Sequence, residues 1–479
     1  MRNRFNDSPE LGMKPIEETP VLEKTRDAMY SVIRALLAIY RNEEYRNKVL
    51  DVVEAKLTNG KKATGRPGLT FWQIFVLAEF RMGLDLTYDR LHSMAFSDSV
   101  LRQLLGIESV GFNKRVVFSR KRIQKNVRLL SDEDLQKINS IIVDFGHKEV
   151  FVEKKREDGL KLKTDSFPVQ TMVHFPSDHS LLNDSARKAG DTMEKIIKKE
   201  EVTGWRKHKD WINSIKNLQR TYSKANSSGG KNKQIRTLKA ADAYLTKAKA
   251  FSKKLRQFID NPTISNPIDV VFLVFLVEYV RLLDKHIDLF YRRVKLGEEI
   301  PHEEKMFSIF EQYSEWISKG KRNVEIGKNT LITTDQYGLI IDYHILENET
   351  DSQTVTGLRS RILSSYKVYS WSFDKGFWKK ENFEILSKSI DMVVMPKKGK
   401  PNKEEKAREN EAEFKRLRKK HSAVESNINE LEHSGLHRCR DKGYEGFKRY
   451  VGMGVVAYNL KRIGRELLGQ DRIKRQKAA

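Results

Sequence analysis

Three acidic residues, widely separated along the chain, stand in contexts where a carboxylate needs a partner. Asp165 interrupts the β-like run GLKLKTDSFPVQTMVHF, and Asp374 ends the run YKVYSWSFDKGF. Burying an unpaired carboxylate in an apolar strand is costly unless a cation compensates its charge. Glu425, the third acid, lies in the segment FKRLRKKHSAVESNINELE at residues 414–432. We interpret these three residues as candidate ligands of a divalent cation.

Residues 414–432 have the pattern of one amphipathic helix. Apolar residues recur there at three- and four-residue spacing, which predicts a single buried stripe. The stripe consists of Phe414, Leu417, Val424, Ile428 and Leu431. Glu425 lies about 100° round the helix from Val424, so its carboxylate can point into a cleft beside the core.

Mg2+ is the cation that such a set of acids fits best. It prefers oxygen ligands in near-octahedral geometry and leaves positions for water and phosphate oxygens. Two ions about 3.5–4 Å apart would activate an attacking oxygen and stabilise a leaving oxygen at phosphorus. Each acid considered alone is weak evidence, because most Asp and Glu residues keep surfaces soluble. Asp335, Asp342 and Asp351 compete for the middle role, although Asp342 also fits an outward-facing strand position.

The net charge of the chain favours a polyanionic partner. Its 479 residues include 90 Lys plus Arg against 65 Asp plus Glu, which gives a formal net charge of +25. Nucleic acid or an anionic surface is the partner that this charge indicates. The length allows two or three domains. A single cysteine, Cys439, excludes an internal disulfide and a cysteine-rich zinc site.

Basic residues near the candidate acids and in the N-terminal region are candidates for contacting DNA phosphates. They are Arg122, Lys375, Lys379, Arg416, Arg418 and Lys420. Two histidines, His174 and His421, are candidate accessory residues of the same site. A packed strand residue is the favoured interpretation of His174, and a residue at the edge of a core is the favoured interpretation of His421.

The first 150 residues have helical patterns. Residues 22–58 have helical periodicity, Thr70 is a plausible N-cap after the turn-forming GRPG, and Ser131 opens a helix with a capping-box pattern. Short helices are expected at 86–95 and 97–106. Such a cluster of helices commonly carries a DNA-reading helix-turn-helix. A helical cap or a dimerisation domain without DNA contact is the alternative.

The pattern changes after Gly159 to short strands that alternate with helices. Strands are expected at 160–167, 168–175, 328–335, 337–346, 366–373 and 391–396, and helices at 352–364 and 376–388. This order predicts a mixed sheet flanked by helices. Residues 181–320 interrupt it as a lysine-rich helical insertion, with ANSSGGKNKQ at 225–234 as an exposed hairpin tip.

We expect a cytoplasmic, nucleoid-associated protein with no membrane partner. The N-terminal MRNRFNDSPELGMKP is charged and lacks the apolar core of a signal peptide. The most apolar run, Val270 to Val277, is far shorter than the roughly 20 residues of a membrane span. We interpret this run as part of a buried helix.

Three segments, in the expected order, resemble the catalytic domain of bacterial insertion-sequence transposases of the DDE class. They are LKTDSFPVQTMVHFPSDHSLLNDSARK, WSFDKGFWKKEN and the stretch from RKKHSAVES to NLKRIGR. The stretch GRPGLTFWQIFVLAEFRMGLDLTYDRLHSMAFSDSVLRQLLGI is similar to the helical domain that precedes catalysis in the same group. The resemblance therefore extends over both the helical and the strand-containing parts of the chain.

The resemblance implies an α+β protein with a ribonuclease-H-like mixed β-sheet flanked by helices. Its first acid falls on Asp165 in the first strand, its second on Asp374 at the end of the fourth strand, and its third on Glu425 in a later helix. Glu432 is the rival for the third position, because the Tyr that related groups place before this Glu is missing here. The implied domains are an N-terminal all-helical domain for DNA binding or dimerisation, a ribonuclease-H-like catalytic domain, and a long helical insertion within it. Their ranges are 1–150, 151–180 together with 321–470, and 181–320.

The resemblance also implies a reaction and its partners. The expected cofactor is a pair of Mg2+ ions, for which Mn2+ can substitute. A homodimer would bind the terminal inverted repeats and the target DNA, and catalyse strand cleavage and strand transfer. Two alternatives stay open at this point. One is a ribonuclease-H-like nuclease that cleaves without joining, and the other is a domesticated DNA-binding regulator without activity.

Overall fold

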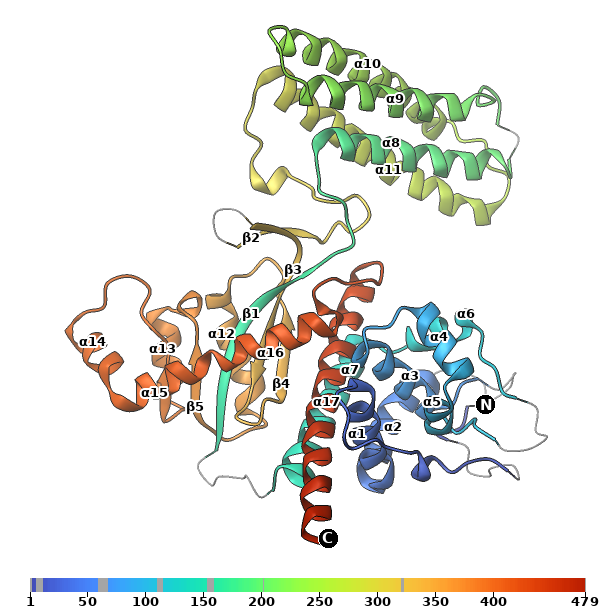
Figure 1. Cartoon of the computed structure of the whole chain (residues 1–479). Helices are drawn as coiled ribbons and strands as arrows, with labels where there is room; N and C mark the ends of the chain where they lie inside the picture. The colour runs from blue at the N-terminus through green and yellow to red at the C-terminus, as the bar shows by residue number, and fades with distance from the viewer. Residues whose placement is uncertain are drawn as a thin grey trace. The chain divides into compact units, whose positions relative to one another are not determined.

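The computed structural model of the chain describes residues 2–5, 12–58, 68–109, 115–152, 159–200, 202–319 and 323–478. The chain divides into two compact units (Figure 1). Residues 1–172 and 317–479 form the first unit, and residues 173–316 form the second. The second unit is thus an insertion in the sequence of the first.

The described residues of the chain form a six-stranded mixed sheet. Its strands are β1 (Leu160–Gln170), β2 (Glu315–Lys319), β3 (Asn323–Thr334), β4 (Ile340–Ile345), β5 (Val368–Phe373) and β6 (Met392–Val394). The order is β2-β3-β1-β5-β6, and β4 also pairs with β3. β3 runs antiparallel to both β1 and β4, whereas β5 is parallel to β1 and β6 is parallel to β5. If the short β2 is set aside, β5 is the fourth strand, as the ribonuclease-H-like resemblance implied.

Helices cover the sheet, which confirms the predicted mixed sheet flanked by helices. α12 (Asp351–Leu363) and α13 (Lys380–Ser387) share a hydrophobic core with β1 and β5. In this core the helical residues Leu358 and Leu386 join the strand residues Trp371 and Phe373. α15 (Ala412–His421) contacts β5 and β6, and α16 (Ala423–Leu431) contacts β1.

The N-terminal helices share a unit with the sheet. They are α1 (Ala28–Arg41), α2 (Glu43–Thr58), α3 (Phe71–Gly83), α4 (Tyr88–Ser97), α5 (Ser99–Leu104), α6 (Arg120–Val127) and α7 (Asp132–Phe145). The long C-terminal helix α17 (Tyr444–Ala478) contacts α1, α3, α7 and β4, and thereby joins these helices to the sheet. The predicted N-cap at Thr70 and the predicted capping box at Ser131 are both confirmed, and Thr70 also forms a capping box, with Gln73 as its second member. Most of the GRPG turn lies outside the described residues.

The second unit is a helical bundle with its own core (Figure 1). Its helices are α8 (Asp178–Ile197), α9 (His208–Ser227), α10 (Lys233–Asp260) and α11 (Val270–Tyr291). Buried Met193, Ile215, Phe251, Leu255 and Leu283 come from all four helices. The predicted hairpin tip at 225–234 falls between α9 and α10, as expected.

Three expectations from the sequence are wrong in detail. Residues 168–175 do not form a second strand, because β1 continues to Gln170 and the chain then leaves the sheet. The expected single helix at 414–432 is divided at Ser422 into α15 and α16. The apolar stripe nevertheless continues through the division, since Phe414 and Val424 are both fully buried.

The third correction concerns the apolar run in α11. Its helical state is confirmed, but Val270, Val271, Val274, Phe275 and Val277 are between 45% and 63% exposed. The run was therefore wrongly expected to be buried, since only some of its residues, such as Leu276, point into the bundle. Within the described ranges, every helix is too short or too polar to cross a membrane.

Candidate active site

The first two predicted acids lie at neighbouring positions, one within β1 and the other directly after the adjacent strand β5. Thr164 of β1 pairs with Phe373 of the parallel strand β5. Asp165 and Asp374 are the next residue of each chain, so the same register places them side by side, with their strands about 4.8 Å apart. Asp374 directly follows the end of β5 and is exposed, whereas Asp165 lies within β1 and is half-buried.

Four carboxylates act on one another at this point of the sheet. Burial, together with the negative charges of Asp374, Asp351 and Glu425, raises the pKa of Asp165 to about 6. A hydrogen bond from the backbone N–H of Ser166 to Asp165 Oδ1, 2.8 Å long, opposes this rise. Each of the three predicted acids is thus close enough to share an electrostatic environment, although they are separated widely in the sequence.

Asp351, which competed for the middle role in the sequence, lies close to Asp165 and Asp374. It is the first residue of α12, it accepts a hydrogen bond from the Ser166 side chain, and its Oδ1 is buried without a hydrogen bond. Burial, together with the charge of Asp374, raises its pKa. The turn after Asp374 lies against it, since a Cβ at Gly376 would be 3.2 Å from Asp351 Oδ2.

Glu425 reaches the site from the first turn of α16. α16 contacts β1, and the carboxylate is exposed rather than packed in the core. Glu425 is one of the carboxylates that raise the pKa of Asp165. The choice of Glu425 over its rival, Glu432, stays a prediction.

His421 is the last residue of α15, and its side chain contacts β5, the strand that ends just before Asp374. Its Nδ1 is 3.0 Å from Ser372 Oγ, and its Nε2 is buried without a hydrogen bond. Burial lowers the pKa of His421 to about 4 against the opposing charge of Asp374. The neutral ring therefore positions the end of α15 next to β5.

Two of the rival acids have structural partners. Asp335 Oδ1 accepts hydrogen bonds from the backbone N–H groups of Tyr337 and Leu339, and its Oδ2 is 2.6 Å from His147 Nε2. These bonds close the turn between β3 and β4. Asp342 forms an ion pair with Arg361 at 2.9 Å, in agreement with the expectation that it is a structural residue.

A basic hollow adjoins the candidate acids. It has a volume of about 560 Å3 and is lined by residues of β1, β5 and the junction between α15 and α16. Lys161, Lys163 and Lys420 supply its cations, and burial lowers the pKa of Lys163. Lys420 was a predicted DNA contact, whereas Lys161 and Lys163 were not. They alternate with Leu162 and therefore lie on the same face of β1 as Asp165. This alternation is a sequence signal from which Lys161 and Lys163 could have been predicted.

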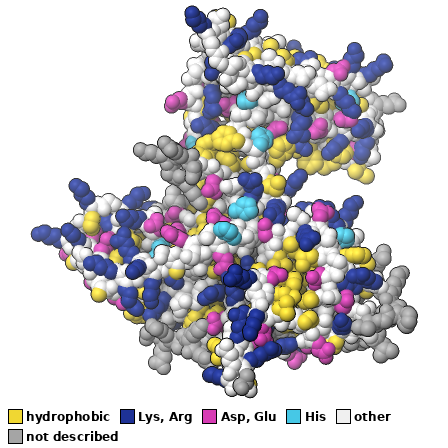
Figure 2. Space-filling model, in the orientation of Figure 1, with side chains coloured by type: hydrophobic (Ala, Val, Ile, Leu, Met, Phe, Trp, Pro, Cys, Tyr) yellow, Lys and Arg dark blue, Asp and Glu magenta, His cyan; other side chains and the backbone are white. Residues whose placement is uncertain are grey.

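The other predicted contact residues differ in their surroundings. Lys375 and Lys379 are exposed immediately after Asp374, and Arg122 of α6 is half-buried with its guanidinium over Phe118. Arg416 forms an ion pair with Glu413, and Arg418 lies 3.9 Å from Glu409. Lys and Arg side chains gather over the surface that α14 (Lys403–Asn410) and α15 form (Figure 2).

His174 belongs to the helical unit rather than to the unit of the sheet. Its Nε2 is 3.4 Å from Asp184 Oδ2 of α8, and its side chain is exposed. The accessory role of His174 stays a prediction.

The donor atoms near Asp165 suit a hard divalent cation in chemical type. Carboxylate oxygens are the ligands that Mg2+ prefers, and the charged neighbours that raise the pKa of Asp165 are all carboxylates. Among the described residues, however, no group of three or more His, Cys, Asp or Glu side chains has the spacing of a metal site. The exposed side chains of Asp374 and Glu425 can rotate without disturbing the core. The acids therefore fit a divalent cation in the type of their donor atoms and in their location.

The mixed sheet flanked by helices is consistent with the ribonuclease-H-like class. A comparison of the sequence with known families is more specific, because residues 294–460 match the transposase DDE domain. The match confirms the resemblance of this chain to DDE-class transposases, a family for which DNA is the partner. It includes Asp374 and Glu425 but begins after Asp165. Comparisons with curated proteins and with solved structures found no match.

Proposed function

We propose that this protein is a divalent-metal-dependent DNA transposase that binds the terminal inverted repeats of its element. The observation that supports this most strongly is that Asp374 and Glu425, both distant from Asp165 in the sequence, lie near enough to it to raise its pKa. The match to the transposase DDE domain supports the same proposal independently of the geometry.

Asp165 and Asp374 would hold one Mg2+ ion, and Glu425 would complete the site of a second. Bound Mg2+ activates a water and stabilises the negative charge that develops on phosphate oxygens. Mn2+ has similar ligand preferences and would substitute. Asp351 lies beside these acids, and a bound cation would also favour its ionised form.

The reaction consists of two displacements at phosphorus. Water attacks the scissile phosphate at an end of the element, the P–O bond to the 3′ oxygen breaks, and a free 3′-OH remains. This hydroxyl then attacks a phosphate of the target DNA and displaces its 3′ oxygen, which joins the two strands. Lys161, Lys163 and Lys420 in the adjoining hollow would neutralise the phosphates of the bound strand.

Both ends of an element must be cut and joined together, so the proposed active form is a homodimer on DNA. The cations that the sequence indicated, Arg122, Lys375, Lys379, Arg416 and Arg418, would contact the duplex outside the site. Arg416 would have to exchange its ion pair with Glu413 for a phosphate.

The experiment is strand cleavage and strand transfer in vitro with DNA that carries the element's own ends. Wild-type protein is expected to nick these ends with Mg2+, and Asp165→Asn, Asp374→Asn and Glu425→Gln to reduce the rate at least about 1000-fold, by analogy with removal of an essential catalytic group. Asp391→Asn is the matched control, because Asp391 is exposed before β6 in the same unit. Nicking by Asp165→Asn at the wild-type rate would exclude the proposed mechanism, and nicking without joined products would favour the simple nuclease.

A further inference from the structure

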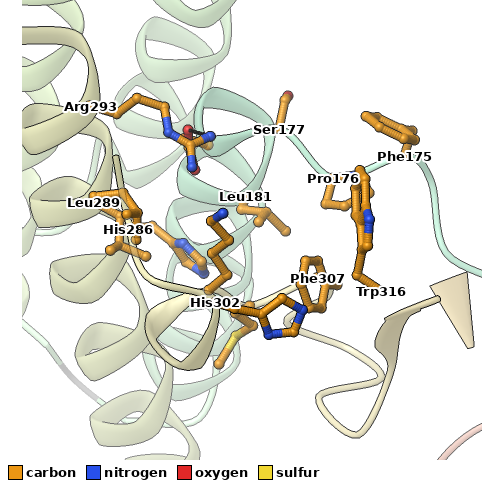
Figure 3. A pocket seen from close by; sticks show the side chains of 14 residues that line it. Phe175, Pro176, Ser177, Leu181, His286, Leu289, Arg293, His302, Phe307 and Trp316 are labelled. Carbon is orange, nitrogen blue, oxygen red and sulfur yellow. Dashed lines mark ion pairs between the residues drawn. The ribbon is translucent and has the colours of Figure 1, made fainter. Parts of the chain in front are cut away.

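The helical unit contains a cavity that the proposed catalytic site does not use. It has a volume of about 260 Å3 and lies where the start of α8, the end of α11 and the segment after α11 meet (Figure 3). All the residues that line it belong to residues 173–316, so it is complete within one unit.

One side of this cavity is a continuous run of aromatic rings. Phe175 and Trp316 have ring centroids 5.6 Å apart, those of Trp316 and Phe307 are 5.8 Å apart, and those of Phe307 and His302 are 5.6 Å apart. Phe175 is 68% exposed, and Trp316 and Phe307 are half-buried. Aromatic rings left in contact with solvent beside a cavity offer a surface on which a planar ligand can stack.

A buried histidine faces the same cavity without a polar partner. His286 of α11 has no exposed surface, yet it lines the cavity, and neither Nδ1 nor Nε2 forms a hydrogen bond. Burial lowers the pKa of His286 to about 4, so the ring is neutral at pH 7. A neutral imidazole presents one donor and one acceptor, and buried polar atoms of this kind normally have partners.

The cavity also carries a surplus of positive charge. Its charged residues are Arg293, Lys305 and Asp178, and Asp178 forms an ion pair with Arg293 at 2.7 Å. Lys305 is exposed and is the cation left over when Arg293 and Asp178 balance each other. An apolar ligand would use neither this cation nor the imidazole, so the ligand must be planar, polar at its edge and anionic.

We propose that this cavity binds a nucleotide. The base stacks on Phe307 and Trp316 and presents its polar edge to His286, and Lys305 together with Arg293 receives the phosphate. The neighbouring side chains must shift slightly for the base to reach His286, because the ring is completely covered. The ligand is either a free nucleotide or an unpaired nucleotide of a DNA strand. The second source rests on the proposed action on DNA, whereas the first does not.

The test uses the full chain with Asp165→Asn and no divalent metal, so that cleavage cannot interfere. A single-stranded oligonucleotide with one 2-aminopurine reports stacking by fluorescence quenching, and the matching duplex and free dAMP are the other two probes. We expect quenching with the single strand or displacement by dAMP. Trp316→Ala and His286→Leu are each expected to weaken binding about tenfold, the size expected for loss of one base–aromatic contact.

Two controls separate binding from folding. Phe310→Ala removes another exposed aromatic ring, which lies near Arg187 and Lys188 but outside the cavity, and should leave binding unchanged. His286→Leu replaces an unsatisfied polar ring by an apolar one, so it should raise the melting temperature while it weakens binding. A purely structural histidine would lower the melting temperature and leave binding unchanged.

The probes distinguish a free nucleotide from a nucleotide of a DNA strand. Competition by dAMP assigns the cavity to a free nucleotide, and binding of the single strand alone assigns it to DNA. The proposal is overturned if 2-aminopurine is not quenched and dAMP does not bind, or if Trp316→Ala and His286→Leu bind as tightly as the parent protein. This experiment measures binding and not cleavage. A failure of the proposed catalytic function would therefore not change its result, and a failure to bind a nucleotide would not contradict the proposed catalytic function.

Discussion

Asp165 is the residue whose surroundings differ most from those of an ordinary aspartate. Its carboxylate lies within a strand, where burial and three neighbouring carboxylates all disfavour its ionised form. A cation would remove this penalty, and DNA phosphates alone would increase it. We therefore expect a cation to bind at this site before the DNA or together with it.

The first prediction concerns the stability of the protein without metal. The pKa of Asp165 is 3.8 in an ordinary environment and about 6 in the folded chain. Folding is therefore penalised above pH 6, where the carboxylate is ionised, and the penalty disappears as the pH falls from 6 toward 3.8. Asp165→Asn should stabilise the metal-free protein at pH 7.5 by about 1–3 kcal/mol after allowance for partial exposure.

Thermal unfolding in a chelating buffer measures this effect. The gap in melting temperature between Asp165→Asn and wild type should be largest at pH 7.5 and should narrow as the pH is lowered to 4. A gap of the opposite sign at pH 7.5, or one that does not depend on pH, would show that the carboxylate is not penalised.

The sequence predicted some of these residues and not others, for a physical reason. Asp165 and Asp374 each break an apolar strand pattern, which is a local signal, and the parallel register then brings them together. Asp351 was only a competitor for the middle role, because the start of α12 meets Ser166 through tertiary packing, for which the sequence carries no local signal. Asp335 gave a misleading signal, since a turn-capping aspartate also follows a strand.

At the scale of elements, the sequence predicted where helices begin more accurately than which of their faces are buried. Thr70 and Ser131 begin their helices because a hydroxyl and a side chain three residues later satisfy the free N–H groups there. No glycine or proline marks the division at Ser422, so a single helix was expected. The apolar run in α11 was expected to be buried because its composition is apolar. Composition alone does not determine how many other elements pack against a helix.

α17 is the element on which the packing of the sheet unit depends. Its glycines allow close approach of neighbouring helices, most closely at Gly464, where a Cβ would lie 1.7 Å from the carbonyl oxygen of Ser31 in α1. Arg34 and Asp471 form an ion pair at 2.6 Å between the same two helices. Gly469, also in α17, has no atom within 4 Å of the position that its Cβ would take.

The second prediction compares these two glycines. Gly464→Ala must separate α1 from α17 and should destabilise the protein by about 1–3 kcal/mol or more. Gly469→Ala meets no neighbour and should stabilise the helix by about 0.5–1 kcal/mol, because alanine loses less backbone entropy. Urea denaturation, followed by circular dichroism, measures both. Equal effects of the two substitutions would contradict the proposed close packing of α1 on α17.

At the scale of the whole molecule, the helical unit has the properties of an inserted domain. It has a hydrophobic core drawn from all four helices, and its first and last residues are close, since Phe175 contacts Trp316. Neighbouring ends allow a domain to be inserted into another without disturbing either fold. The sequence predicted the insertion from its composition, with boundaries at 181 and 320 instead of 173 and 316.

The third prediction is that residues 173–316 fold without the rest of the chain. This fragment, expressed alone, should have helical circular dichroism and unfold in one cooperative transition. As a control, the same fragment with Phe251→Ala should lose about 3–5 kcal/mol, because Phe251 is fully buried in its core. A fragment that unfolds gradually, or whose stability is unaffected by this substitution, would show that the core depends on the other unit.

The account as a whole depends on whether the acids at the end of β5 and around Asp165 hold a divalent cation. Titration of the full chain with Mn2+, monitored by the electron paramagnetic resonance signal of the free ion, measures this directly. Wild type and Asp391→Asn should bind Mn2+ alike, and Asp165→Asn should bind it at least about 10- to 100-fold more weakly, the loss that even outer-shell substitutions cause. Equal binding by wild type and Asp165→Asn would contradict the account.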